Sequence, residues 1–572
     1  MQSVDYTTLM ATVSEIQKEW IPARTEQVYQ RDRNTISIAL RTLKKRSWLT
    51  ISWHPQAARL CIATPPPRKP DTFTFSDQLR HQLGGLALVK IEAIAPWERV
   101  LDFQFSRRPG DPILWHLYVE IMGKHSNVIL TDASNNIVTA AHQVGPKKSS
   151  IRPVQTGQPY DPPPALTGTT PSLNESQERW QERISLIPGA LKRQMLNSYR
   201  GLSPKLVTSM VEAAGLNPNQ LTDTLNPSNW EKLFERWQEW LSILETENYS
   251  PGWTEDGYTV LGWGMLKPEK NIQVLLDRYY TDELNQQAFK QLRHQLSQKL
   301  SNLLSKLYQK GGTFEERLQQ SQEADEYRQK ADLLMAHLHE WQPGMTSISL
   351  AYFETGNPVK IPLNPEKNAV QNAQALYKKH QKLKRAQIAV KPLLEEVKGE
   401  ISYLEQVEAA LNSIEDYETP EDLQTLEEIR EELIVQGYLE APREQGGSKD
   451  DESHPLRYKT PSGFELWIGR NNRQNDQLTF RTAGEYDLWF HTQEIPGSHV
   501  LLRLEPGAVP DEADLQCAAD FAAYFSRARQ SDQAPVVYTN PKYVYKPKGA
   551  KPGMAIYKHE TVIWGHPQRV KG

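Results

Sequence analysis

The stretch FKQLRHQLSQKLSNLLSKL, residues 289–307, decides the fold of this chain. Its apolar residues recur three or four positions apart, as they do along one face of an α-helix. The repeat resumes beyond Gly311 and Gly312 in residues 324–338, and a second apolar stripe runs through residues 376–411. The positions between are polar, so neither helix can bury its stripe except against a partner. We therefore predict an antiparallel coiled-coil hairpin.

The turn of this hairpin is predicted between Trp341 and Pro362, where Pro343-Gly344 stops the first helix. Pro392 lies within the second stripe and can kink that helix, which we expect to end between Glu415 and Pro420. A helix of roughly fifty residues is about 75 Å long, at about 1.5 Å per residue. Such an arm usually reaches a partner, although a spacer or a dimerisation coil is the alternative.

Length and composition limit the class of protein. A chain of 572 residues is too long for one core, so roughly three or four domains are expected. The sequence has no run of about eighteen apolar residues, and the amphipathic start is charged, so we expect neither a membrane span nor a secretory signal. Cys61 and Cys517 lack Cys or His at ligand spacing and are expected to be buried thiols of a cytoplasmic protein. No metal site, disulfide or cofactor is predicted.

Charge is distributed unevenly along the chain. The net charge of -4 is unlike that of a nucleic-acid binder, but acids gather in residues 415–452 and the C-terminus is basic. From Val536 onward the one acid is Glu560, and four tyrosines lie among the cations. Ammonium groups neutralise phosphates and aromatic rings stack on bases, so this tail is a candidate RNA surface, with a solvated face as the alternative. The cations are Lys542, Lys546, Lys548, Lys551, Lys558, Arg569 and Lys571.

The predicted fold class is multidomain α+β. Residues 48–53 and 59–63 are expected to form an antiparallel pair, and residues 75–83 a helix that ends at Gly84-Gly85. Residues 250–278 indicate a small strand-and-turn insert, and strands return after residue 456 with one helix near residues 515–525. The predicted domains are an N-domain (1–175), a helix-hairpin-helix region (176–278), the coiled-coil hairpin (279–440), a linker (441–455) and a C-domain (456–572).

The helix-hairpin-helix prediction depends on the turn Gly201-Leu202-Ser203. Ser203 is expected to cap the second helix, with Pro204 in its first turn. In this motif backbone N–H groups face a nucleic-acid phosphate without contacting bases. A purely structural turn is the alternative, because glycine-rich turns between helices are common.

The sequence contains no recognised pattern of catalytic residues. Phosphate-loop, His-Glu-x-x-His, Gly-x-Ser-x-Gly and kinase patterns are absent. His491 and His499 near Ser498 suggest a nucleophile and base, but no third group is identifiable and Pro496-Gly497 indicates a turn into a strand. We therefore predict no catalytic residue.

Residues 120–127 of the N-domain are densely polar between two predicted strands. Gly123 permits a sharp backbone turn, so Lys124, His125, Ser126 and Asn127 are expected to project from one rim, as in a ligand-binding loop. A capped turn with satisfied polar groups is the alternative.

These motifs resemble those of the NFACT family. Glu120–Asn127 resembles the signature of the NFACT N-terminal domain, historically described as a fibronectin-binding domain. The resemblance covers nearly the whole chain, since the order of domains also matches. The stretches that resemble the NFACT RNA-binding domain are Gly469–Asn472 with Asn475-Asp476, Asp487–Thr492, Ile495–Val500 and Tyr543–Gly553.

The resemblance implies a bacterial ribosome quality control factor. Such a factor binds a large ribosomal subunit obstructed by peptidyl-tRNA, recruits tRNA, with alanyl-tRNA expected, and promotes template-free alanine tailing of the stalled chain. Peptide-bond chemistry is implied to stay with the ribosome, so the protein is not expected to be an enzyme. The implied partners are the large subunit, tRNA, peptidyl-tRNA and rRNA, without a membrane and with the protein as a monomer on the ribosome.

The resemblance also assigns candidate residues. An Asp-Arg pair that the family needs for tailing and tRNA engagement corresponds to Glu98 and Arg99, and Glu moves the carboxylate outward by one methylene. The candidate tRNA residues are Glu98, Arg99, Lys124, His125, Ser126 and Asn127. The candidate RNA residues are Arg470, Asn471, Asn472, His491, Ser498, His499, Lys542, Lys546, Lys548 and Lys551.

Two other functions are alternatives. The NFACT N-domain with its helix-hairpin-helix is similar in fold to formamidopyrimidine DNA glycosylases, so a glycosylase-like α+β domain is expected. Gln2 stands where those enzymes need proline, and the zinc-binding cysteines are absent, so glycosylase activity is rejected. The second alternative is a surface fibronectin-binding adhesin, which the predicted lack of a signal and an anchor disfavours.

Overall fold

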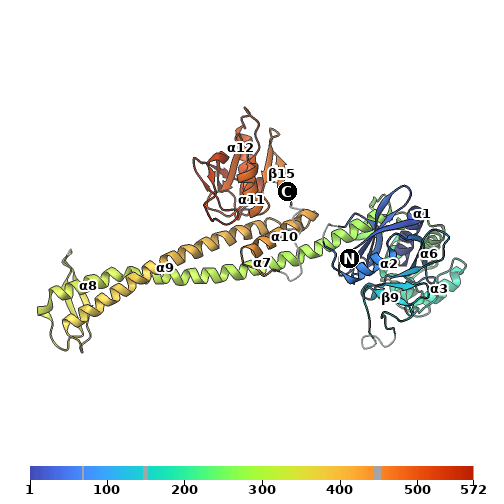
Figure 1. Ribbon diagram of the computed structural model, residues 1–572, viewed down its shortest axis with the longest axis horizontal. Coiled ribbons are helices and arrows are strands. Elements are labelled where there is room, and N and C mark those ends of the chain that lie inside the picture. The colour runs from blue at the N-terminus through green and yellow to red at the C-terminus, as the bar shows by residue number, and fades with distance from the viewer. Residues whose placement is uncertain (67–69, 146–151, 166, 354, 442–452, 571–572) are drawn as a thin grey trace. The chain divides into compact units, whose positions relative to one another are not determined.

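The protein is described from a computed structural model (Figure 1). The structure describes residues 1–66, 70–145, 152–165, 167–353, 355–441 and 453–570. The chain divides into a first unit, residues 1–285, and a second unit, residues 286–441 and 453–570. Both units combine helices with antiparallel sheets, which confirms the predicted α+β class. Most of the predicted linker, 441–455, lies outside the described residues.

A nine-stranded antiparallel sheet forms the body of the first unit, in the order β4-β3-β2-β1-β5-β6-β7-β8-β9. The predicted pairing of 48–53 with 59–63 is confirmed, because Trp48 lies opposite Ala63. The sequence pattern did not predict β1 and β2, since β1 is mostly polar and alternates weakly. The strands are β1 (Ala23–Asp32), β2 (Thr35–Arg41), β3 (Arg46–Ser52), β4 (Arg59–Ala63), β5 (Ala87–Ala93), β6 (Val100–Ser106), β7 (Trp115–Glu120), β8 (Asn127–Asp132) and β9 (Ile137–Ala140).

Two helices complete the N-domain core. Asp5 accepts a hydrogen bond from the Thr8 backbone N–H at 2.9 Å and so caps α1 (Tyr6–Trp20). Leu9, Val13 and Ile16 lie at helical spacing on α1 and are buried in the core of the first unit. The predicted helix at 75–83 is confirmed as α2 (Thr74–Leu83), followed by Gly84.

Four further helices and a small sheet complete the first unit. The large indoles of Trp180, Trp237 and Trp240 are fully buried among the helices. Ser203 caps α5 by accepting from the Leu206 N–H at 3.0 Å, as predicted. The helices are α3 (Gln177–Ser185), α4 (Leu191–Ser198), α5 (Pro204–Ala213) and α6 (Pro227–Thr246). The predicted insert forms β10 (Gly252–Thr254), β11 (Gly257–Thr259) and β12 (Lys267–Pro268).

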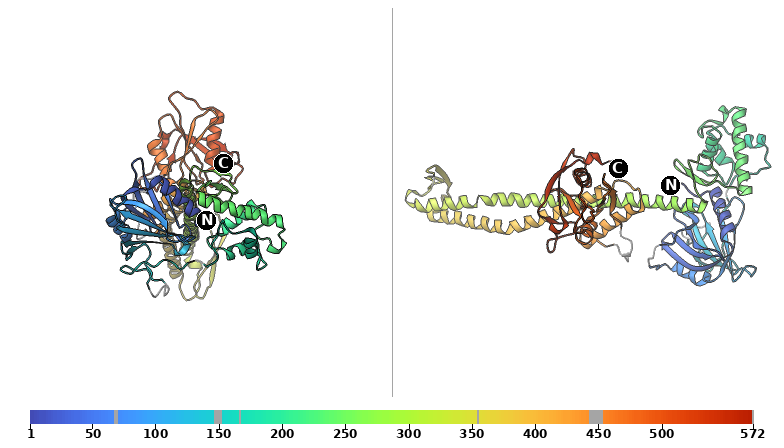
Figure 2. Two further views of the ribbon diagram at one scale, coloured as in Figure 1. Left: turned by 90° about the vertical axis from the view of Figure 1, so that its right-hand side faces the viewer. Right: turned by 90° about the horizontal axis from the view of Figure 1, so that it is seen from above.

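The predicted helical hairpin is present in the second unit. It is formed by the continuous helix α7 (Ile272–Gln322), then α8 (Ala324–Ala336), and the returning α9 (Ala369–Asn412), which lie side by side in Figures 1 and 2. α7 starts before the expected position 279, and its first residues, such as Ile272 and Tyr280, are buried in the core of the first unit.

Contacts along the pair establish its antiparallel direction. The Arg293 side chain donates to the Ile414 carbonyl at 2.9 Å, and Lys398 pairs with Glu315 at 3.0 Å. Farther along, the Lys379 ammonium donates to the Tyr327 hydroxyl at 2.7 Å. Residue numbers therefore rise on one helix as they fall on the other.

Both long helices continue through the glycine pair and the proline noted in the sequence. α7 continues through Gly311-Gly312, and a Cβ at Gly311 would lie 3.6 Å from Val397, an ordinary packing distance. α9 continues through Pro392, which is exposed, so water can satisfy the carbonyl that loses its intrahelical partner. The second helix also ends at Asn412, slightly before the predicted segment from Glu415.

The apolar seam is the set of buried residues at the base of the hairpin. It joins α7 and α9 to α10 (Pro420–Val435), so the base has three helices. At the other end, β13 (Ser347–Ala351) and β14 (Pro358–Pro362) pair and share a small core with α8. The seam residues are Phe289, Leu292, Leu296, Leu300, Leu304, Tyr403, Leu404, Val407, Ala410, Leu411, Ile414, Leu426, Ile429 and Leu433.

The C-domain is a six-stranded antiparallel sheet in the order β15-β16-β18-β17-β19-β22. The predicted single long helix is α12 (Glu512–Tyr524), whose alanines pack on one face of the sheet. Trp489, Leu501 and Val537 form a second core on the other face. The elements are β15 (Leu456–Lys459), β16 (Glu465–Ile468), α11 (Asn472–Gln477), β17 (Leu488–Thr492), β18 (Val500–Leu502), β19 (Ala534–Thr539), β20 (Val544–Tyr545), β21 (Ile556–Tyr557) and β22 (Thr561–Gly565).

We expect Leu300→Ala to destabilise the hairpin by about 2–5 kcal/mol, because Leu300 is fully buried in the seam and truncation leaves a cavity. Urea unfolding followed by the helical circular dichroism signal measures the effect. Lys299→Ala is the control, since Lys299 is exposed on the same turn and its loss should change stability by less than about 0.5 kcal/mol. Equal stabilities of the two variants would contradict the packing described.

Candidate nucleic-acid interface

Trp97 positions the loop that carries Glu98 and Arg99 between β5 and β6. Its backbone has φ 65°, a left-handed conformation that is costly for a bulky residue. The indole packs on Tyr6 with ring centroids 4.8 Å apart and on Trp240 at 5.5 Å. The strained backbone is thus held by aromatic packing from α1 and α6.

The helix-hairpin-helix turn covers the other side of Trp97. A Cβ at Gly201 would lie 2.7 Å from Trp97 Cε3, so only glycine fits, and its φ of +82° also favours glycine. Ser203, at the start of α5, donates to Asp5 Oδ2 at 2.6 Å. The turn therefore binds the N-domain of its own chain.

This arrangement corrects the phosphate-binding expectation for the turn. The N-terminus of α5 attracts anions, but the Asp5 carboxylate already lies there through Ser203. Gly201, Leu202 and Ser203 are all partly buried. The structure favours the alternative that the turn is structural.

Arg99 is half-buried beside this turn. Its Nη1 donates to the Val4 carbonyl oxygen at 3.2 Å. Burial lowers the pKa of the guanidinium from its ordinary value, and the carboxylates of Asp5 and Glu98 oppose that effect. The bond to Val4 fixes one edge of the guanidinium, which has five N–H donors in all, so donors remain that can serve a ligand.

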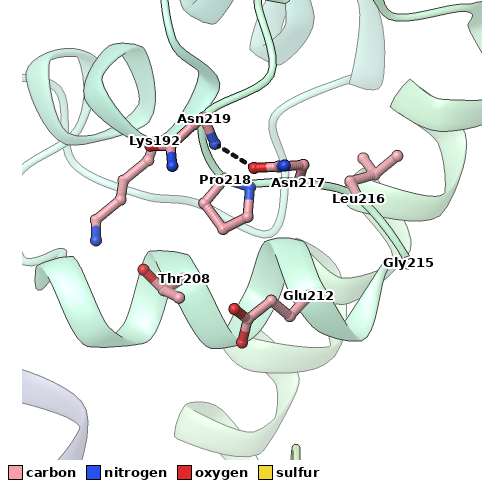
Figure 3. A pocket seen from close by; sticks show the side chains of 8 residues that line it. All are labelled: Lys192, Thr208, Glu212, Gly215, Leu216, Asn217, Pro218 and Asn219. Atoms are coloured by element: carbon pink, nitrogen blue, oxygen red, sulfur yellow. Dashed lines mark hydrogen bonds between the residues drawn. The ribbon is translucent and has the colours of Figure 1, made fainter.

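A shallow hollow of about 620 Å³ lies elsewhere in the helix-hairpin-helix region, between the start of α4 and the face of α5. Figure 3 shows the Lys192 side chain extending over α5, on which Thr208 and Glu212 lie. The Asn219 N–H donates to Asn217 Oδ1 at 2.9 Å, which closes the turn at its rim. With one cation facing one carboxylate, the hollow has no net preference for phosphate.

The predicted rim of residues 124–127 is only half correct. Lys124 and His125 are exposed on a 3-10 turn, Gly123–His125. Ser126 and Asn127 are buried, with 6% and 4% of their surfaces exposed. Ser126 Oγ accepts from the Met122 N–H at 2.8 Å, and Asn127 Nδ2 donates to the His142 carbonyl at 2.8 Å. Both side chains hold the turn and do not project from it.

The trio Arg470, Asn471 and Asn472 does not face solvent, which corrects its assignment to RNA. Each residue is at most 6% exposed, because the acidic helix α10 lies against them. Arg470 pairs with Asp422 through Nη2 and with Glu421 at 3.4 Å. The amide of Asn471 donates to Glu428 at 2.6 Å, and that of Asn472 donates to Glu432 at 3.1 Å.

Two of the four candidate lysines of the C-terminal tail also have partners within the second unit. Lys546 pairs with Asp476. The Lys551 ammonium donates to the Tyr438 hydroxyl and lies 4.6 Å from the ring centroids of Tyr403 and Tyr438. Burial lowers the pKa of Lys551. Lys551 therefore fastens the C-domain to the hairpin.

The histidines near Ser498 belong to the core of the C-domain. His499 is 2% exposed and its Nδ1 shares a hydrogen bond of 2.7 Å with Thr479. His491 stacks on Trp489 with centroids 5.7 Å apart. Burial lowers the pKa of His491 to about 4 and that of His499 to about 3, so both rings are neutral near pH 7. Ser498 is also buried, so neither Ser498 nor His499 projects toward RNA, and His491 is partly buried.

Lys542 and Lys548 are the candidate RNA residues that remain exposed with no ion pair within the described part of the chain. Lys542 lies 5.1 Å from the Tyr543 ring, and the Tyr545 side chain nearby is 48% exposed. Cations beside an exposed ring are the groups that neutralise phosphates and stack on bases. Lys542 and Lys548 therefore stay candidates for RNA contacts.

Three general features of the described residues bear on function. They hold no cluster of three or more His, Cys, Asp or Glu side chains arranged to bind a metal. Among the described helices, none is sufficiently long and apolar to span a membrane. Cys61 is buried as predicted, whereas Cys517 on α12 is only half-buried.

Comparison with protein families matches two consecutive models to the chain. The model of NFACT N-terminal and middle domains matches residues 5–452, and that of the NFACT protein RNA binding domain matches residues 455–558. The chain belongs to the NFACT family. The resemblance drawn from the sequence motifs is thereby confirmed.

Relatives within the NFACT family match along the whole chain. The Rqc2 homolog RqcH of Bacillus subtilis (strain 168) is 33% identical over 97% of this chain and 96% of its own. The Rqc2 homolog RqcH of Streptococcus suis (strain 05ZYH33) is 32% identical over 94% of both chains. A solved structure of the C-terminal part of the fibronectin/fibrinogen-binding protein of Streptococcus suis is 32% identical, with TM-score 0.38, and covers 49% of this chain and 96% of that chain.

Sequence reasoning missed the residues that hold the NFACT candidate sites in place. Trp97 adjoins the Glu98-Arg99 pair, but nothing in the sequence signals its left-handed backbone. Asp5 could be recognised as a helix cap, whereas its hydrogen bond to Ser203, across 198 positions, could not. The sequence shows the acids of α10 as a charged stretch, but it does not show that they pair with residues 470–472.

We expect Asp422→Ala to destabilise the second unit by about 3–5 kcal/mol, because it leaves the buried Arg470 guanidinium without its main partner. Scanning calorimetry measures the loss. The double variant Asp422→Leu with Arg470→Met removes both charges and should recover much of it. Glu427→Ala, which removes an exposed acid of the same helix, is the control; a loss as large as that of Asp422→Ala would contradict the role assigned to the buried pair.

Acidification should destabilise the C-domain between about pH 6.5 and pH 4. The folded pKa values of His491 and His499, about 4 and about 3, lie below the ordinary 6.5, so the unfolded chain binds more protons in that window. Stability present above pH 6.5 is then lost on acidification, by about 1.4 kcal/mol per pH unit for each histidine. Unfolding midpoints at several pH values should show a smaller slope for His499→Asn and an unchanged slope for His559→Asn, an exposed control.

Proposed function

We propose that this chain, a ribosome quality control factor of the NFACT family, binds large ribosomal subunits obstructed by peptidyl-tRNA. It recruits tRNA, with alanyl-tRNA expected, and promotes template-free addition of alanine to the stalled chain. The observation that carries the proposal is the match of both NFACT modules in order, together with relatives named RqcH that align over nearly the whole chain.

The helical hairpin supports a role on a large particle. α7 has 51 residues in one helix, which corresponds to about 75 Å at about 1.5 Å per residue. The seam holds the hairpin together at its base, and its small distal core lies around β13 and β14. We propose that the distal end contacts the ribosome while the two NFACT modules bind RNA.

Glu98 and Arg99 are the proposed tRNA contacts of the N-domain. Arg99 is held at one edge by the Val4 carbonyl, so its planar guanidinium is pre-oriented for a phosphate. Lys124 and His125 are exposed in the same unit and are proposed to add to this contact. Ser126 and Asn127 are proposed only to hold the turn.

Lys542 and Lys548 are the proposed RNA contacts of the C-terminal tail. Their exposed ammonium groups can release counterions from a phosphate backbone, and Tyr545 can stack on a base. We further propose a cytoplasmic protein that acts as a monomer on the ribosome. The peptide bond is made by the ribosome, and the chain positions RNA without catalytic residues of its own.

A surface fibronectin-binding adhesin, the alternative considered from the sequence, is the competing function. Cell fractionation separates the two functions. Sedimentation of the chain with large subunits supports the proposal, and its retention on the cell surface after removal of ribosomes contradicts it.

Arg99→Ala should lower alanine tailing at least tenfold while large-subunit binding stays within about twofold, because the change removes one charge-assisted contact to tRNA, worth about 1.5–3 kcal/mol. Mass spectrometry of a stalled reporter chain measures the tail. Sequencing of tRNA that copurifies with large subunits measures recruitment.

Arg107→Ala is the matched control, because Arg107 is an exposed cation that follows β6 in the same unit. Thermal unfolding of each variant separates a misfolded N-domain from a lost contact. Unchanged tails with Arg99→Ala, or large subunits that carry no tRNA with the unaltered protein, contradict the proposal.

A further inference from the structure

Two arginines flank one tryptophan on the C-domain sheet. Arg457 on β15 lies directly opposite Trp467 on β16, and its guanidinium carbon is 4.3 Å from the indole centroid. Leu501 on β18 is opposite Trp467 on the other side, so Arg503 lies two residues farther along the same face. The Arg503 guanidinium carbon is 4.9 Å from the indole centroid. The three planar groups form one cation–π cluster.

The two arginines differ in how their charge is balanced. Arg503 pairs with Asp487 at 3.3 Å and donates to the Thr482 carbonyl at 2.9 Å. Arg457 is exposed, and it makes no ion pair with any described residue. The Trp467 Nε1–H donates to Glu465 at 2.9 Å, which fixes the indole plane. Arg457 therefore presents a planar cation that has no ion-pair partner among the described residues and rests on an aromatic ring.

A cavity of about 260 Å³ opens beside this cluster. Arg457 and Trp467 form part of its lining, with the exposed side chains of His454 and Gln477 close by and Thr482 at its edge. Among the residues that the structure describes, none that lines the cavity is acidic. The volume suits a single nucleobase with its sugar, and the lining offers a cation, a stacking plane and an amide that can both donate and accept hydrogen bonds.

We propose that this cavity is a nucleotide-binding site, in which a base stacks on the Arg457–Trp467 pair and the adjoining phosphate is neutralised by Arg457. The proposal rests on the proposed function, because the ligand it names is a nucleotide of an RNA strand. Bases stack on aromatic rings and on arginine planes alike, so the cluster recognises an unpaired nucleotide without reading its sequence.

The described lining of the cavity includes none of the tail lysines. β15 lies at one edge of the sheet, and β19, which precedes Lys542, lies four strands away in the order of strands. The tail returns to α11 at Lys546, which pairs with Asp476, next to Gln477 of the cavity lining, so one strand of RNA could contact both places. An acidic peptide could also pair with Arg457, but it would make no use of the stacked plane.

Photo-crosslinking with the full-length protein tests the proposal. A single-stranded RNA decamer that contains 4-thiouridine should crosslink to a peptide that bears Arg457 or Trp467, as identified by mass spectrometry. Arg457→Ala should reduce this crosslink about tenfold and leave crosslinks to the peptide with Tyr545 unchanged. Arg457→Lys should also reduce it at least fivefold, because lysine keeps the charge and loses the plane.

Lys459→Ala is the matched control, since Lys459 is an exposed cation of the same strand outside the cavity lining. Full crosslinking by Arg457→Lys overturns the nucleotide site and favours a partner recognised by charge alone, such as an acidic peptide. Crosslinks at the tail but none at the cavity overturn the site while the proposed function stands, whereas no RNA crosslink anywhere overturns both. A parallel labelling experiment with 8-azido-AMP distinguishes a free nucleotide from an RNA strand as the ligand. Labelling of the same peptide by 8-azido-AMP supports a free nucleotide, and labelling by the decamer alone supports an RNA strand.

Discussion

The apolar seam between α7, α9 and α10 is the constraint on which the second unit depends. Each helix is polar around most of its surface, and only the stripe that includes Leu300 on α7 and Val407 on α9 is buried. In proteins most helical stability comes from the packing of an apolar face, so both long helices depend on this seam. The third helix, α10, adds Leu426, Ile429 and Leu433 to the seam and turns its opposite, acidic face outward. The seam thereby creates the surface on which the C-domain lies.

The contact between α10 and the C-domain is a buried polar network. Arg470 is 6% exposed, and the carboxylate of Glu432, which accepts from Tyr403 at 2.7 Å and from Asn472, has its pKa raised by burial. Buried ionic groups add little net stability compared with apolar packing, but a broken pair is very costly. All of these hydrogen bonds and ion pairs can form together in only one orientation of the C-domain on α10. Residues that look like an RNA-binding motif in the sequence serve here to orient the domain.

Local sequence patterns were sufficient to predict the hairpin, α2, the pairing of β3 with β4 and the C-domain helix. Each of these elements depends on periodicity or on neighbouring turn residues. The candidate sites were less predictable. Arg470 meets Asp422 across 48 positions and Lys551 meets Tyr438 across 113, and no local pattern reveals a partner at such a separation. Nor does composition show that Trp97 adopts a left-handed backbone, since aromatic packing from α1 and α6 overrides its local preference. Residue type therefore identified polar side chains at the candidate sites, but it did not show whether they face solvent or the interior of the protein.

Whether a lysine or arginine of this acidic chain can bind an RNA phosphate depends on whether a carboxylate of the protein already pairs with it. A lysine or arginine already paired with a carboxylate releases few counterions when a phosphate approaches, so it contributes little to affinity. Lys546 and Arg470 are paired in this way, and Lys551 is partly buried against two tyrosines. Arg457, Lys542 and Lys548 keep exposed charges, and each has an aromatic ring in contact or nearby in the chain. RNA affinity of the C-domain then depends on a few phosphate contacts, so it should weaken with salt far less steeply than that of a protein whose whole surface is basic.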